Sequence, residues 1–169
     1  MEATAFVALA LACAPQVNVA TAQALISVES SFNPWAIGIV GGALERQPRN
    51  RAEALITARS LRAAGWNFSV GLGQINVSNF ARLALTDEKA FEPCANLAAM
   101  QTLLLDCFER ARPPPSLLDI DQVTLRRALS CYYSGDFATG FHQGYVRKVV
   151  AASADIGRAR PLALGREKS

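Results

Sequence analysis

Glu29 is the residue of this chain whose position best suits acid–base chemistry. It lies at the end of a predicted helix over residues 19–30, where Ala22, Leu25 and Ile26 form an apolar stripe and Glu29 takes the next position on that face. A carboxyl group there is partly removed from water and lies near the negative end of the helix, and both effects raise its pKa. A general acid near neutral pH needs such an environment. The alternative is a helix-end glutamate turned towards solvent.

Two other segments carry groups that suit a sugar ligand. In residues 71–76, glycines allow the backbone to approach a ligand, while Gln74 and Asn76 supply amide hydrogen bonds. Tyr132 shares the apolar face of another predicted helix, so its phenol must find a partner. Each segment has a structural alternative. The first is also consistent with an ordinary turn, and Tyr132 with a core tyrosine bonded to a backbone carbonyl.

Helical periodicity dominates the sequence and predicts an all-α fold, α+β at most, with a small hairpin around Gly41 and Gly42. We expect one domain over residues 1–153 and a flexible tail over residues 154–169. Residues 3–12 are either the apolar part of an export signal or, since no basic residue precedes them, a first core helix. The other predicted helices cover residues 19–30, 51–64, 77–83, 96–112 from Asn96 to the prolines, a segment capped by Asp121, and 145–153.

The composition is that of a folded protein, with 169 residues, 51% hydrophobic and 18% charged, and a formal net charge of +3. This mild positive charge suits an anionic polymer such as a cell wall, and the absence of a Lys/Arg run argues against nucleic acid. No apolar stretch approaches the ~20 residues that span a bilayer. With one histidine and no Cys-x-x-Cys pair, we expect no metal and no cofactor.

Four cysteines suit two disulfides in an exported protein, or buried thiols in one that is not exported. Cys94 and Cys107 flank one predicted helix, and the rise between them far exceeds the ~7 Å that a bridge allows between Cα atoms. These two residues therefore do not bond to each other. We predict the disulfides Cys13–Cys94 and Cys107–Cys131.

Taken together, three ordered motifs resemble those of the lytic transglycosylases of the goose-lysozyme-like superfamily. They are Glu29-Ser30 followed by Phe32-Asn33-Pro34, then Gly71-Leu72-Gly73-Gln74-Ile75-Asn76, then Ala128-Leu129 leading to Tyr132 and Gly135. Further segments are similar to the transglycosylases encoded with bacterial type IV secretion systems. These segments are Cys13-Ala14-Pro15, Pro34-Trp35-Ala36-Ile37-Gly38, Pro93-Cys94, residues 130–137 and residues 144–149.

The resemblance implies a lysozyme-like domain with an active-site cleft, acting on peptidoglycan in the periplasm as a monomer, in contact with type IV secretion or pilus components. It implies that Glu29 is the catalytic glutamate and that Tyr132 hydrogen-bonds it. The chain departs from the family pattern at Gly73, where a larger residue, often Met, is usual, and at Tyr133, where Asn is usual. The implied substrate-binding residues are Ser30, Gly71, Leu72, Gly73, Gln74, Ile75, Asn76, Tyr133 and Tyr145.

The implied reaction is that of a lyase, which cleaves the β-1,4 bond between N-acetylmuramic acid and N-acetylglucosamine and closes a 1,6-anhydro ring, with Glu29 as the single acid/base. Glycosidases with paired carboxylates place two acids ~5–10 Å apart. No Asp or Glu lies between Asn67 and Thr86, the segment expected to line the cleft, and Asp136 is the only acid next to a motif. The alternatives are a hydrolytic lysozyme with a second acid and a non-catalytic wall-binding component of the secretion assembly.

Overall fold

The computed structural model describes residues 1, 3–112 and 121–158. The sequence prediction of a helical fold with a small β element is confirmed. The helices are α1 Ala3–Cys13, α2 Val19–Ser30, α3 Arg51–Ala63, α4 Asp87–Ala90, α5 Pro93–Ala111, α6 Asp121–Ser134, α7 Thr139–His142 and α8 Tyr145–Arg158, with a 3₁₀ turn η1 at Val77–Asn79. The strands are β1 Ile37–Ile39, β2 Phe68–Val70 and β3 Ile75–Asn76.

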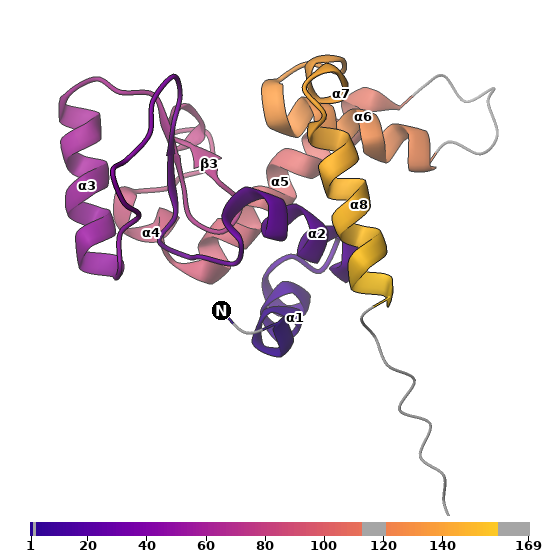
Figure 1. Cartoon of the computed structure of the whole chain (residues 1–169), viewed down its shortest axis with the longest axis horizontal. Helices are drawn as coiled ribbons and strands as arrows, with labels where there is room; N and C mark the ends of the chain where they lie inside the picture. The colour runs from indigo at the N-terminus through magenta and orange to yellow at the C-terminus, as the bar shows by residue number, and fades with distance from the viewer. Residues whose placement is uncertain (2, 113–120, 159–169) are drawn as a thin grey trace, which may run out of the picture.

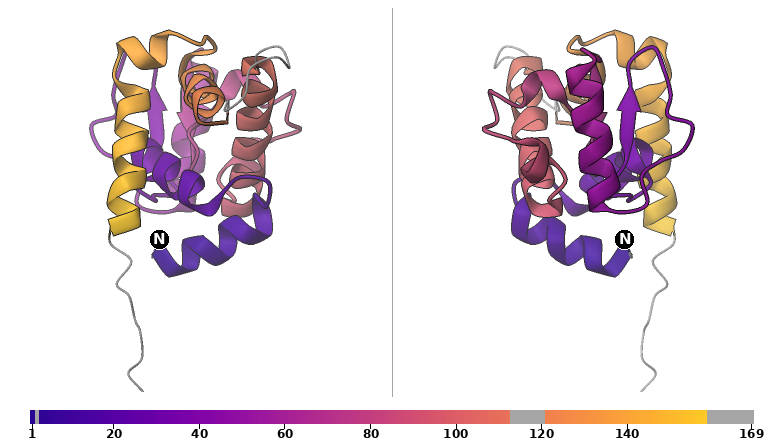
Figure 2. Two further views of the ribbon diagram at one scale, coloured as in Figure 1. Left: turned by 90° about the vertical axis from the view of Figure 1, so that its right-hand side faces the viewer. Right: turned by 90° about the vertical axis from the view of Figure 1, so that its left-hand side faces the viewer.

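Helix α5 runs through the middle of the molecule and separates two groups of elements (Figure 1). The small sheet, α3 and α4 lie on one side, and α6, α7 and α8 lie on the other. Helix α1 crosses one end of the molecule (Figure 2). The sheet is antiparallel in the order β1-β2-β3, with Val70 paired to both Ile37 and Ile75. Within the described residues, no helix has the length and apolar character needed to cross a membrane.

Helix α2 forms as the sequence predicts, and this places Glu29 in its last turn. The Asn18 side chain caps the helix by accepting a hydrogen bond from the Ala20 amide at 2.9 Å. The predicted stripe of Ala22, Leu25 and Ile26 is fully buried. The helix ends at Ser30, and the next residue, Ser31, caps it in a left-handed conformation with φ of 50°.

Both predicted disulfides are present, Cys13–Cys94 with a Cα separation of 5.2 Å and Cys107–Cys131 with one of 5.7 Å. The first ties α1 to α5, and the second ties α5 to α6. Phe6 of α1 is fully buried in the core. Residues 3–12 therefore form a core helix, which is the second of the two interpretations of this segment.

Several predicted boundaries are wrong. The hairpin predicted around Gly41 and Gly42 does not form, because β1 pairs with β2 and the tight hairpin joins β2 to β3. Helix α5 begins at Pro93 rather than Asn96, since proline fits the first helical turn, where its missing N–H is not needed. The helix predicted at 77–83 is only the turn η1, and α8 continues past Ser153 to Arg158. Residues 159–169 of the predicted tail lie outside the described part, and the domain division stays a prediction.

A buried amide on α5 connects this helix to the β2–β3 hairpin. Asn96 is 1% exposed. Its Nδ2 donates to the carbonyls of Val70, at 3.0 Å, and Ala90, at 2.8 Å, while its Oδ1 accepts from the Gly73 amide at 2.7 Å. Gly71 has a φ of +78°, and a Cβ there would lie 2.2 Å from Asn96 Nδ2, so only glycine fits this turn. Asn96 thus fixes the turn that carries residues 71–74.

We predict that Asn96→Ala strongly destabilises the protein, because it leaves three buried backbone groups without partners. The loss should be about 3 kcal/mol in the free energy of unfolding, or roughly 10 °C in Tm. Thr102→Ala, at an exposed position of the same helix, is the matched control. Denaturant unfolding measures both variants, and equal stabilities would contradict the structural role of Asn96.

Candidate active site

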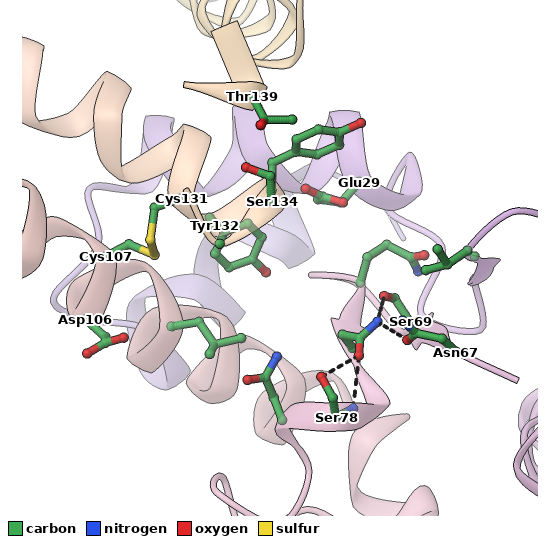
Figure 3. A pocket seen from close by; sticks show the side chains of 18 of the residues that line it. Glu29, Asn67, Ser69, Ser78, Asp106, Cys107, Cys131, Tyr132, Ser134 and Thr139 are labelled. Atoms are coloured by element: carbon green, nitrogen blue, oxygen red, sulfur yellow. Dashed lines mark hydrogen bonds between the residues drawn. A yellow bond between two sulfur atoms is a disulfide. The ribbon is translucent and has the colours of Figure 1, made fainter. Parts of the chain in front are cut away.

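A cleft of about 830 Å³ lies beside α5, and Figure 3 shows the side chains that line it. Glu29, Tyr132 and Ser134 lie on one side, and Asn67, Ser69 and Ser78 lie on the opposite side. Most of the lining residues carry polar side chains, whose amide and hydroxyl groups suit a carbohydrate. The lining residues are Glu29, Gly38, Ile39, Val40, Asn67, Ser69, Gln74, Asn76, Ser78, Asn79, Arg82, Leu103, Asp106, Cys107, Arg110, Cys131, Tyr132, Tyr133, Ser134, Gly135, Thr139 and Gln143.

The Glu29 carboxyl group lines the cleft, and its pKa lies near neutral pH. Burial raises its pKa from the usual 4.5 to about 7, against the opposing effect of a hydrogen bond from Tyr145. The Tyr145 hydroxyl donates to Oε1. Among the described residues, Oε2 has no hydrogen-bond partner, so this oxygen is free to carry the proton. The raised pKa predicted from the sequence is confirmed, with burial as its main cause.

The predicted hydrogen bond between Tyr132 and Glu29 is wrong. The Tyr132 hydroxyl donates instead to the Gly73 carbonyl at 2.5 Å. A Cβ at Gly73 would lie 3.0 Å from both this hydroxyl and Met100 Cβ, so the absence of a side chain makes room for the tyrosine. Tyr132 still lines the cleft, and burial, with a contribution from the Glu29 charge, holds its pKa well above its usual value. Its contact with the hairpin is thus shown, and a direct role in catalysis stays a prediction.

Tyr145 makes the contact with Glu29 that the sequence resemblance gives to Tyr132. It begins α8 and is 5% exposed, and burial and the Glu29 charge raise its pKa far above its usual value, so it remains a donor. The Tyr133 ring stacks on it with centroids 4.4 Å apart. The Tyr133 hydroxyl donates to Gln143 Oε1 at 2.7 Å. Tyr133 lines the cleft where the family pattern has Asn, so this departure adds an aromatic surface beside Glu29.

Of the predicted ligand-binding amides, Gln74 and Asn76 do line the cleft, but their donors are used internally. Gln74 Nε2 donates to the carbonyls of Ala36, at 3.2 Å, and Gly71, at 2.9 Å, which leaves Oε1 to accept from a ligand. Asn76 Nδ2 donates to Asn67 Oδ1 at 2.8 Å and to Ser69 Oγ at 3.2 Å (Figure 3). These bonds organise the polar floor of the cleft.

The remaining residues of the predicted binding set do not line the cleft. Leu72, in the turn, and Ile75, in β3, are fully buried, because both side chains pack in the hydrophobic core. The Gly71 and Gly73 amides and carbonyls are used to fix the turn. Ser30 turns its hydroxyl back to the Ile26 carbonyl at 3.3 Å. The predicted substrate contacts of Ser30, Gly71, Leu72, Gly73, Ile75 and the buried Tyr145 are therefore not brought to the cleft.

Among the described residues, Glu29 and Asp106 are the acids that line the cleft. The sequence analysis missed Asp106, which lies on α5 between Arg82, at 3.7 Å, and Arg110, at 3.6 Å. Asp136 is not a lining residue. Its carboxylate accepts from the Thr139 hydroxyl, at 2.6 Å, and from the Thr139 and Ala138 amides, each at 2.8 Å, and these bonds lower its pKa to about 2, so it caps a turn. No cluster of three or more His, Cys, Asp or Glu in the described part could hold a metal ion.

Comparison with known proteins agrees with this geometry. The family model for the transglycosylase SLT domain matches residues 6–152. The chain belongs to this family. It is 46% identical over 166 residues to the type IV secretion system protein virB1 of Brucella suis biovar 1, which covers 94% of this chain and 67% of the relative. It is 48% identical over 158 residues to the Brucella abortus protein of the same name, and the match covers 89% of this chain and 64% of that relative. It is 38% identical over 146 residues to protein virB1 of Agrobacterium fabrum, and the match covers 85% of this chain and 57% of that relative.

The chain spans about two thirds of the length of the Brucella relatives and somewhat less of the Agrobacterium one. No solved structure matches it significantly. The family resemblance inferred from the motifs is confirmed, and the two Brucella relatives carry type IV secretion names.

We predict that Glu29→Gln is more stable than the wild type at neutral and alkaline pH. The raised pKa of Glu29 gives the wild type stability that is fully present below pH 4.5 and is lost as the pH rises through about 7. Gln does not ionise, so its relative stability should grow across this window, by up to about 3 kcal/mol.

Urea unfolding at a series of pH values tests this. Glu53→Gln is a control of opposite sign, because Arg46 lowers the pKa of Glu53. A difference between Glu29→Gln and wild type that does not change with pH would show that Glu29 is not in a desolvated environment.

Proposed function

We propose that this protein is a peptidoglycan lytic transglycosylase in which Glu29 is the single catalytic acid and base. The observation that supports this most is the placement of one carboxyl group, with a pKa of about 7, in a polar cleft of a transglycosylase-family domain. A group with this pKa is populated in both protonation states at neutral pH, as a residue with two successive roles requires.

In the first step, protonated Glu29 donates its proton to the glycosidic oxygen between N-acetylmuramic acid and N-acetylglucosamine. The bond from the muramic C1 to that oxygen breaks, and C1 develops oxocarbenium character. In the second step, the Glu29 carboxylate takes the proton of the muramic C6 hydroxyl while O6 bonds to C1. This closes the 1,6-anhydro ring and returns Glu29 to its protonated form. The C6 hydroxyl competes with water because it belongs to the same sugar.

Tyr145 orients Glu29 in this scheme. Its hydroxyl remains a donor in both steps, so it fixes Oε1 and leaves Oε2 for the substrate. The bond also stabilises the carboxylate and lowers the pKa, which keeps burial from making Glu29 too weak an acid.

The two alternatives have less support. A hydrolytic lysozyme needs a second acid to activate water. Asp106 lies across the cleft from Glu29 and is paired with Arg82 and Arg110. Asp136 caps a turn and does not line the cleft. A non-catalytic wall-binding component would have no need for a buried carboxyl group with a raised pKa, because burial of such a group costs stability at neutral pH.

The setting of this activity is proposed from the relatives and the disulfides. Two disulfides suit an oxidising compartment, and peptidoglycan lies in the periplasm of bacteria with two membranes. The Brucella relatives are named as type IV secretion system proteins. We therefore place the enzyme in the periplasm, where it opens the wall locally for assembly of a secretion system rather than for bulk wall turnover.

Digestion of purified peptidoglycan tests the reaction. The wild type should release muropeptides that end in 1,6-anhydro-N-acetylmuramic acid, one water lighter than hydrolytic products and unchanged by borohydride. Glu29→Gln should lower kcat by about 10³-fold, whereas Glu45→Gln, an exposed glutamate outside the cleft, should not. Reducible ends as the main product would identify a lysozyme, and full activity of Glu29→Gln would refute the catalytic assignment.

The cellular role is tested by exchanging the chromosomal allele for Glu29→Gln in a strain with no second transglycosylase for its secretion system. Secretion or conjugative transfer should fall, while growth and cell shape stay as in the wild type. Transfer at the wild-type level with a stably expressed variant would show that the wall-cleaving activity does not serve secretion.

A further inference from the structure

Two arginines and one aspartate form a charged group on the wall of the cleft away from Glu29. Arg82 Nη1 lies 3.7 Å and Arg110 Nη1 lies 3.6 Å from the same oxygen, Asp106 Oδ2. All three side chains line the cleft and are about half exposed, at 51%, 53% and 43%. Figure 3 shows Asp106 beyond the Cys107–Cys131 disulfide, on the other side of the cleft from Glu29.

The donors of both guanidinium groups are largely unused. The two contacts with Asp106 are longer than a hydrogen bond. Arg82 makes one weak bond, from Nη2 to Asn79 Oδ1 at 3.4 Å, and among the described residues Arg110 donates none. Arg110 is nevertheless restrained, since its guanidinium lies 5.7 Å from the centre of the Phe137 ring. Two positioned cations thus share one carboxylate at the cleft surface, and an excess positive charge remains.

We propose that Arg82 and Arg110 form a subsite for a free carboxylate of the peptide stem that peptidoglycan carries on its muramic acid residues. This inference deepens the proposed function and rests on it. A guanidinium group recognises a carboxylate through paired N–H donors, and two of them bind an anion even beside Asp106 because their charges exceed its own. The enzyme therefore selects strands whose stems retain free carboxylates.

Asp106 has a definite place in this arrangement. Without a ligand, it offsets the repulsion between the two guanidinium groups and holds them near each other. With a carboxylate bound, it repels the ligand and limits the affinity. Asp106→Asn should therefore strengthen binding to carboxylate-bearing stems, whereas Arg82→Gln and Arg110→Gln should weaken it.

The experiment measures binding to purified sacculi by co-sedimentation, with every variant made in the Glu29→Gln background so that no substrate is cleaved. Half of each sacculus preparation is treated with carbodiimide and ammonia, which converts the stem carboxylates to amides. Arg126→Gln removes the same charge from an exposed position of α6 outside the cleft, and it is the matched control. Thermal melting confirms that each variant is folded.

We expect amidation to weaken binding of the parent and of the Arg126→Gln control about fivefold. Arg82→Gln and Arg110→Gln should each bind untreated sacculi about threefold more weakly and respond much less to amidation. An equal response of all variants would mean that only bulk charge matters and would overturn the subsite. A wild-type protein that fails to cleave would contradict the proposed reaction but would not alter this binding result.

Discussion

The buried amide of Asn96 connects α5 to the β2–β3 hairpin, which lies beside the cleft, and to the end of α4. Its hydrogen bonds to the Gly73 amide and to the Val70 and Ala90 carbonyls hold the β2–β3 hairpin and the end of α4 against α5. Because the hairpin turn is fixed, the Gly73 carbonyl faces α6 and accepts the Tyr132 hydroxyl. A buried polar group that satisfies all of its hydrogen bonds also specifies one arrangement, since any shift of the turn would leave several donors and acceptors unpaired.

The packing of α2 and α8 keeps the Glu29 carboxyl group partly desolvated at the edge of the core. Four buried residues of α2 anchor the helix that presents Glu29, and Tyr145, at the start of α8, donates a hydrogen bond to Oε1. The two tyrosines thus have different roles: Tyr132 hydrogen-bonds the hairpin, and Tyr145 orients Glu29. Gly73 allows the contact between Tyr132 and the hairpin, because a side chain at this position would occupy the space of the Tyr132 hydroxyl.

What the sequence could predict depends on the range of the interactions concerned. The Asn18 cap and the apolar stripe of α2 follow from neighbours within one helix, and the end of that stripe is enough to predict the direction of the Glu29 pKa shift, although its main cause is burial in the whole fold. The spacing of the four cysteines excludes only a bond between Cys94 and Cys107, and the packing of α5 against α1 and α6 selects the two disulfides. The role of Asn96 was missed because an asparagine near a helix start resembles a cap, whereas its partners lie on the preceding segments. The exchange of roles between Tyr132 and Tyr145 depends on the packing of α6 against α8, which no local pattern encodes. Helices α4 and α7 have four residues each, too few for a periodicity to show.

The central claim is that one desolvated carboxyl group, oriented by a tyrosine, is the acid and base of this site. Direct titration of the Glu29 side-chain carboxyl by ¹³C NMR in the folded protein tests it most directly. The structure predicts a midpoint near the value of about 7 that burial produces, and a higher midpoint in Tyr145→Phe, because the Tyr145 hydrogen bond lowers the pKa. A midpoint at the usual 4.5 in the wild type, unchanged by Tyr145→Phe, would contradict the account.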